Sequence, residues 1–166
     1  MYFNKFPQIS YSLDNGRTSF WITDIFRRVS QDSQNLLTTT SYYNYQILDG
    51  ETPDILADRI YSDINLYWVI LVANNIFDPR WEWPLSINAL NTYITDTYGA
   101  GHETDIHHYI NEYGDVVHSS YDGTINAITN INYETDLNEA RRNIVMLKPI
   151  FVGKFVESFN SLITNG

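Results

Sequence analysis

The stretch "YQILDGETPDILADRIYSDINLYWVILVANN", from Tyr45 to Asn75, predicts a small unit of one strand followed by two helices. Tyr45 to Leu48 has the composition of a short strand, and "DGET" follows as its turn. Thr52 is a helix N-cap, and Pro53 takes the first helical position, where a missing N–H removes no helix hydrogen bond. Residues 66–74 form a second helix that is apolar on nearly every side. Such a helix needs cover on more than one face, so the flanks of this unit or a partner must supply it.

Composition excludes several classes of protein. The chain has 166 residues, enough for one domain or for a small module with two flanking segments. It carries 10 Lys and Arg against 20 Asp and Glu, a net charge of −10, which excludes a basic nucleic-acid stripe and disfavours anionic membranes. The absence of cysteine excludes disulfides and thiolate metal sites. The longest apolar run, "LYWVILVA", is far shorter than the roughly 20 residues of a membrane span, and the start "MYFNKFPQIS" predicts no signal peptide.

The segments on either side of the quoted stretch predict a mixed α+β fold. "ISYSL" and "TSFWI" predict an N-terminal hairpin with a two-residue turn at Asn15-Gly16, and residues 23–29 predict a short helix. Ser86 and Gly99 bound a further predicted helix, and a second hairpin is predicted to turn at Tyr113 to Asp115. The expected division is a hairpin, helix and linker at 1–41, a central module at 42–86, and a helix, hairpin and C-terminal helix at 87–166. The last helix is expected to bury one stripe of Phe151, Phe155, Phe159 and Leu162.

The search for catalytic patterns predicts no enzyme, cofactor or metal site. The chain contains neither a nucleophile elbow nor a glycine-rich phosphate loop. One alternative is a metal-dependent enzyme that uses His102, His107 and His108. Their spacing is not that of a zinc protease helix, and His107 and His108 are expected to point to opposite faces of a strand.

The segment "DPRWEWPLS" contains the strongest candidates for protein contact. Trp81 and Trp83 flank Glu82, so in an extended chain both rings point the same way, and we expect one in the core and one at an interface. The two basic pairs are further candidates, because an acidic chain has few cations with which to meet an acidic partner. The candidate contact residues are Arg27, Arg28, Phe77, Asp78, Pro79, Arg80, Trp81, Trp83, Arg141 and Arg142.

The quoted stretch resembles the lysin motif, LysM, a family with a β-α-α-β fold. The resemblance is carried by Tyr45-Gln46-Ile47, by Gly50-Glu51-Thr52, by Ile55 to Ala57, and by Asn74 at the end of the second helix. The second strand of the family is not evident after Asn74, where "DPRWEWPLS" takes its place. LysM modules bind N-acetylglucosamine polymers, so the resemblance implies a peptidoglycan-binding module as an alternative function.

A wider resemblance covers most of the chain. "MYFNKFP", "ITDIFRRV", "GETPDILADRIY", "YWVILVANNIFDPRWEWPLS", "DIHHY" and "NYETDLNEARRNIVMLKP" occur in one order, and together they are similar to the LysM-containing baseplate wedge proteins of contractile-tailed bacteriophages. That resemblance implies a non-enzymatic virion protein, assembled in the host cytoplasm, that clamps neighbouring wedges around the hub of the tail baseplate. It implies six copies per baseplate. The implied partners are the other wedge proteins and the sheath-initiating protein that resembles a lysozyme.

Overall fold

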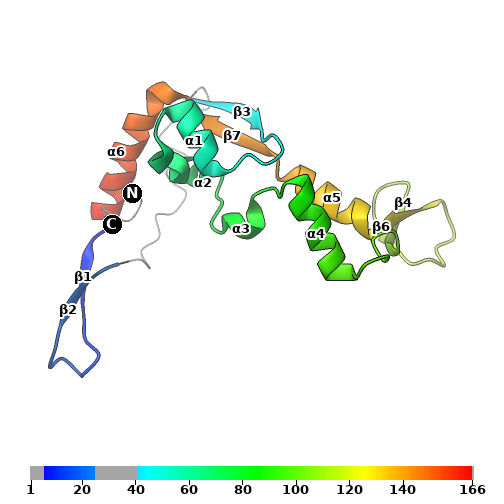
Figure 1. The fold of residues 1–166 in the computed structure, drawn as a ribbon, viewed down its shortest axis with the longest axis horizontal. Coiled ribbons are helices and arrows are strands. Elements are labelled where there is room, and N and C mark those ends of the chain that lie inside the picture. The colour runs from blue at the N-terminus through cyan, green and yellow to red at the C-terminus, as the bar shows by residue number, and fades with distance from the viewer. Residues whose placement is uncertain (1–5, 25–40, 166) are drawn as a thin grey trace. The chain divides into compact units, whose positions relative to one another are not determined.

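The computed structural model describes residues 6–24 and 41–165 as a mixed α+β fold, as the sequence predicts (Figure 1). Helices alternate with small antiparallel sheets of two or three strands. Among the described helices, none combines the length and the hydropathy that a membrane span requires. The division at 1–41, 42–86 and 87–166 stays a prediction.

The described chain forms two compact units. The first comprises the described residues up to Tyr45, together with Thr52–Phe77 and the chain from Val145 onward. The second comprises Gln46–Glu51 and Asp78–Ile144. In sequence, the larger part of the second unit is therefore inserted between Thr52–Phe77 and the C-terminal part of the first unit, and its short part precedes Thr52.

The quoted stretch contains the predicted two helices, but its strand lies at 42–46 rather than 45–48, and the partner of this strand comes from far downstream. Strand β3 (Tyr42–Gln46) pairs with β7 (Asn143–Leu147). Their antiparallel direction follows from backbone hydrogen bonds of 2.9 Å that link Lys148 to Ser41 and Ile47 to Arg142. In the described chain no strand follows directly after Asn74, and the short helix α3 (Pro79–Glu82) comes next. The elements are β3 (Tyr42–Gln46), α1 (Pro53–Tyr61), the 3-10 helix η4 (Ile64–Leu66), α2 (Tyr67–Ala73), β7 (Asn143–Leu147) and α6 (Pro149–Asn165).

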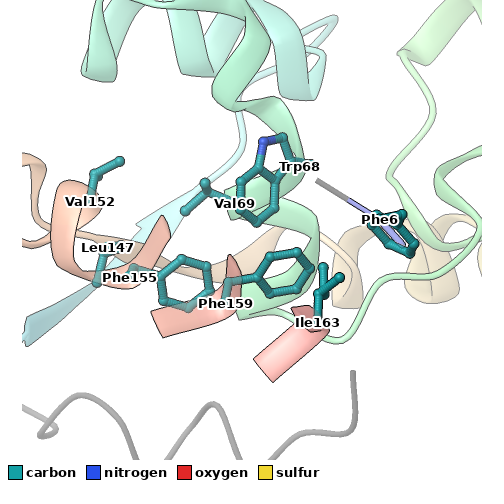
Figure 2. Packing of buried hydrophobic residues seen from close by; sticks show 8 residues of the cluster. All are labelled: Phe6, Trp68, Val69, Leu147, Val152, Phe155, Phe159 and Ile163. Carbon is teal, nitrogen blue, oxygen red and sulfur yellow. The ribbon is translucent and has the colours of Figure 1, made fainter. Parts of the chain in front are cut away.

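The apolar helix α2 is covered by its own chain. Trp68 and Val69 enter a cluster with residues of β7 and α6, and the ring centroid of Trp68 lies 4.7 Å from that of Phe159 (Figure 2). The requirement for cover is therefore met by the flanks of the unit. In α6 the predicted stripe is shifted, because Phe155 and Phe159 are buried but Leu162 is exposed. The buried cluster is Phe6, Trp68, Val69, Leu147, Val152, Phe155, Phe159 and Ile163.

The N-terminal hairpin exists, and the turn predicted at Asn15-Gly16 is confirmed, because both residues have a positive φ and the N–H of Arg17 donates to the carbonyl of Asp14 at 3.5 Å. The strands do not reach this turn, however. Strands β1 (Gln8–Tyr11) and β2 (Phe20–Thr23) leave a longer connection between them. The carboxylate of Asp14 accepts hydrogen bonds from the backbone N–H of Thr18 at 2.7 Å and from its hydroxyl at 2.6 Å, which stabilises the wider loop. The helix predicted at 23–29 and the linker at 30–41 lie largely outside the described residues.

The second unit contains a short helical turn, two longer helices that pack together, and one three-stranded sheet. The predicted helix after Ser86 is confirmed: the Ser86 hydroxyl caps it, and Gly99 ends it with a φ of 91°. The turn predicted at Tyr113 to Asp115 is also confirmed, with the sheet order β5-β4-β6. The elements are α3 (Pro79–Glu82), α4 (Ile87–Tyr98), β4 (Ile106–Asn111), β5 (Val116–Val117), β6 (Ile125–Thr129) and α5 (Asn130–Ala140).

Candidate contact surface

One short helical turn, α3, presents several of the predicted contact residues on a rigid support. The carboxylate of Asp78 accepts a hydrogen bond from the N–H of Arg80 at 3.1 Å, and the carboxylate of Glu82 accepts one from the N–H of Asp78 at 3.0 Å. This reciprocal arrangement is similar to a capping box, and Pro79 at the first helical position reinforces it. The guanidinium of Arg80 also donates to both carboxylate oxygens of Asp78, at 2.9 and 2.8 Å, and these bonds lower the pKa of Asp78.

The two tryptophans of "DPRWEWPLS" have opposite environments. Trp81 is 65% exposed, whereas Trp83 is 5% exposed and donates its indole N–H to the carbonyl of Glu51 at 2.8 Å. The prediction that both rings point the same way is wrong, because the segment is a helical turn rather than an extended chain. Positions two apart on a helix lie on opposite sides. The structure thus has one tryptophan in the core and one at the surface.

A groove of about 290 Å³ lies beside Trp81, in the second unit. Its apolar lining comes from α3, α4 and the turn between them, and charged side chains from α3, α4, α5 and the residue after α5 stand at it. Tyr93 contributes an amphipathic ring to this groove, a residue type that interfaces favour. The sequence predicts a helix at Tyr93 but contains no signal for the groove, because the walls of the groove come from separate elements. The lining includes Arg80, Trp81, Leu85, Ala89, Leu90, Tyr93, Asp96, Glu134 and Arg141.

The adjacent arginines after α5 have different surroundings. Arg141 is exposed and lines the groove. Arg142 is buried, and its guanidinium donates to the carboxylate of Glu139 at 2.6 Å, to that of Asp49 at 3.4 Å, and to the carbonyl of Ile47 at 3.3 Å. Arg142 therefore ties the end of α5 to the residues after β3. Like Trp83, it is engaged in internal contacts rather than presented to a partner.

The other candidates lie elsewhere. Phe77 is 77% exposed, but it belongs to the first unit and takes no part in the groove. Arg27 and Arg28 lie outside the described residues. The structure thus brings Arg80, Trp81 and Arg141 together.

The three histidines of the metal alternative do not converge on one point. The ring Nδ1 of His102 pairs with the carboxylate of Asp105 at 2.7 Å, and the Nδ1 atoms of His107 and His108 lie 2.8 Å apart. The expectation of opposite faces for His107 and His108 is wrong, because a register irregularity in β4 falls between Ile106 and His108 and interrupts the alternation. Over residues 6–24 and 41–165, no group of three or more His, Cys, Asp or Glu side chains could hold a metal ion.

Comparison with known proteins identifies similar chains. A family model described as "Base plate wedge protein 53" matches residues 1–122. The "Baseplate wedge protein gp53" of Enterobacteria phage T4 is 29% identical over 127 residues, a match that covers 74% of this chain and 65% of the relative. The aligned part thus spans slightly less than two thirds of that relative's length.

Proposed function

The chain belongs to the base plate wedge protein 53 family, and we propose that it clamps neighbouring wedges together around the hub of a phage tail baseplate. As a member of this family, it is a structural, non-enzymatic component of the virion tail baseplate. The clamping role is a further step. It requires surfaces on this chain that hold other proteins.

The observation that carries the proposal is the groove beside Trp81. Tryptophan, tyrosine and arginine dominate the binding energy of protein interfaces, and here Trp81, Tyr93 and Arg80 stand around one concave surface. The reciprocal hydrogen bonds of Asp78 and Glu82 fix the backbone under Trp81, so little order has to be gained when a partner binds. A side chain of a neighbouring subunit that entered the groove would bury the exposed face of this indole.

The charge of the groove favours a polar peptide segment as its occupant. The groove is lined by the positive side chains of Arg80 and Arg141 and by the negative side chains of Asp96 and Glu134. A segment with both an acidic and a basic residue would therefore find a partner of opposite charge for each. The net charge of −10 favours partners that are basic overall. The proposed partners are the other wedge proteins and the lysozyme-like protein that initiates the sheath, with six copies of this chain per baseplate.

We assign the first unit to a LysM-like module. Its order is strand, helix, helix, strand, from β3 through α1 and α2 to β7. Asn74, at the helix end where the LysM pattern has asparagine, hydrogen-bonds to Val145 in β7. In this proposal the second strand of the module is β7, and the second unit is inserted in front of it.

The test is co-expression with the wedge proteins encoded beside this chain, followed by size-exclusion chromatography with mass determination. The unmodified chain is expected to elute in a defined complex. Trp81→Ala should weaken that complex at least about tenfold, because the anchor of the groove is lost. The matched control is Tyr113→Ala, which removes an aromatic ring that is 78% exposed in the same unit but outside the groove.

Two outcomes would overturn the proposal. In the first, Trp81→Ala assembles as well as Tyr113→Ala, so the groove holds no partner. In the second, the unmodified chain elutes alone and is retained on purified peptidoglycan, so the LysM-like module serves glycan binding instead.

A further inference from the structure

The hairpin of β1 and β2 has one strongly apolar face. The register pairs Ile9 with Ile22 and Tyr11 with Phe20, and opposed residues two positions apart share a face. These four side chains are between 40% and 53% exposed. The other face pairs Ser10 with Trp21. The hairpin is therefore amphipathic, with half of each apolar side chain open to solvent.

The two strands lack most of the features that protect an exposed sheet edge. Natural edge strands are blunted by shortness, charged residues, prolines or bulges, and of these both strands have only shortness, at four residues each. Gln8–Tyr11 and Phe20–Thr23 contain neither a charged residue nor a proline, and their register is continuous over all four pairs. A two-stranded hairpin is also marginally stable in water by itself. Such a ribbon is typical of a segment that is completed by another protein.

Both ends of the hairpin are fixed by local contacts. Phe6, just before β1, is buried in the core cluster of the first unit, and the N–H of Asp24 donates to the carbonyl of Pro7 at 2.9 Å across the base. At the other end, Ser12 accepts a hydrogen bond from the N–H of Gly16 at 2.8 Å, within the loop that Asp14 also holds. The apolar face is thus held in shape before any partner binds, which lowers the entropic cost of docking.

We propose that the Ile9/Tyr11/Phe20/Ile22 face docks onto an apolar, uncharged surface of another baseplate subunit. This inference rests on the proposed clamping function, since a clamp needs a second contact surface besides the groove. The chemistry of the partner follows from the two strands. They have no charged side chain to pair with, so a charged partner surface would be desolvated without compensation.

A second copy of this chain is a poor occupant. Four half-exposed side chains of this size offer roughly 400 Å² of surface, whereas a stable interface needs about 800 Å² from each partner. Two such hairpin faces would therefore bury too little area. A net charge of −10 on each copy adds repulsion. A larger subunit that also contacts neighbouring parts of the chain satisfies the area requirement.

The experiment compares two serine variants of the full chain in the co-expression assay described above. Tyr11→Ser with Phe20→Ser removes the apolar face and is expected to weaken the complex roughly tenfold or more. Trp21→Ser is the matched control, because Trp21 is 71% exposed on the opposite face of the same strand. It should bind within about twofold of the unmodified chain.

A second measurement keeps the test valid if the double variant loses its hairpin. A photoreactive phenylalanine analogue at position 20 should cross-link to a different baseplate subunit in the assembled complex, and the same analogue at position 21 should do so far less. Cross-links from position 20 only to a second copy, or to none of the subunits, would overturn the inference. So would binding of the isolated chain to phosphatidylcholine vesicles through this face.

The two proposals fail in different ways. If the unmodified chain forms no complex, the clamping function fails and this inference falls with it. If the complex forms, depends on Trp81, and is unaffected by the hairpin variants, only the hairpin inference is wrong.

Discussion

The side-chain amide of Asn74 and the backbone of Val145 exchange two hydrogen bonds, each 2.8 Å long. The amide nitrogen also donates to the carbonyl of Ile70 at 2.8 Å. Asn74 follows the last residue of α2, whereas Val145 lies in β7, on the far side of the inserted unit in sequence. One side chain thus acts as a strand-like partner for β7 and closes the strand–helix–helix–strand arrangement.

Replacing Asn74 with alanine should destabilise the first unit by about 2–3 kcal/mol, because the N–H and carbonyl of Val145 lose their partner in a half-buried place. Asn74→Asp should be as harmful, since a carboxylate cannot donate to the carbonyl of Val145. The measurement is the free energy of unfolding from urea titration. Asn88→Ala, at an exposed helix position, is the control and should change this free energy by less than about 0.5 kcal/mol. Equal effects at the two positions would show that the contact with β7 contributes nothing.

The two tryptophans should separate stability from binding. Trp83→Ala should lower the free energy of unfolding by about 3–5 kcal/mol, because it leaves a cavity and removes the donor to Glu51. Trp83→Phe, which keeps an aromatic ring but has no N–H, should lower the free energy of unfolding by less, about 1–2 kcal/mol. Trp81→Ala should leave the thermal midpoint nearly unchanged while it weakens the wedge complex. Thermal unfolding, followed by circular dichroism, measures the stability of each variant, and the co-expression assay measures its binding. A large loss of stability in Trp81→Ala would contradict the assignment of Trp81 to the surface.

Arg141 and Arg142 provide a second matched pair. Arg142→Ala should destabilise the second unit by about 2–4 kcal/mol, since Glu139 and the carbonyl of Ile47 lose a buried donor. Arg141→Ala should change stability by less than about 0.5 kcal/mol and act on partner binding instead. Urea titration of both variants, beside the co-expression assay, separates the two effects. The assignment fails if Arg141→Ala proves to be the destabilising variant.

These pairs show which features local sequence signals predict. The helix α4 was predictable because Ser86 and Gly99 mark its ends through their own backbone preferences, and α1 was predictable because Pro53 favours a helix start. The difference between Arg141 and Arg142 was not predictable, because both residues have the same chemistry. Only contacts with the carboxylate of Asp49 and the carbonyl of Ile47, which are distant in sequence, distinguish them.

Contacts between distant segments were the other feature that sequence reasoning missed. The pairing of β3 with β7 depends on two strands with an entire unit between them, and nothing in "NIVML" indicates its partner. The groove has the same origin, since Trp81, Tyr93 and Arg141 come from separate elements. The side on which each tryptophan lies was missed for a local reason, because the prolines around "RWEW" favour an irregular loop, whereas the segment forms the short helix α3.

The pair of His102 and Asp105 provides a prediction about pH. Hydrogen bonding and charge attraction from Asp105 raise the pKa of His102 above its ordinary value of 6.5. The charged imidazole is therefore favoured in the folded chain. Its contribution to stability is complete below the pKa of the unfolded chain and is lost as the pH rises through the higher folded value. Asp105→Asn should lower the pKa of His102 toward 6.5, as followed by NMR of its ring protons. Asp122→Asn, which removes an exposed carboxylate elsewhere, should leave the pKa of His102 raised. If Asp105→Asn also leaves it raised, Asp105 is not the cause of the shift.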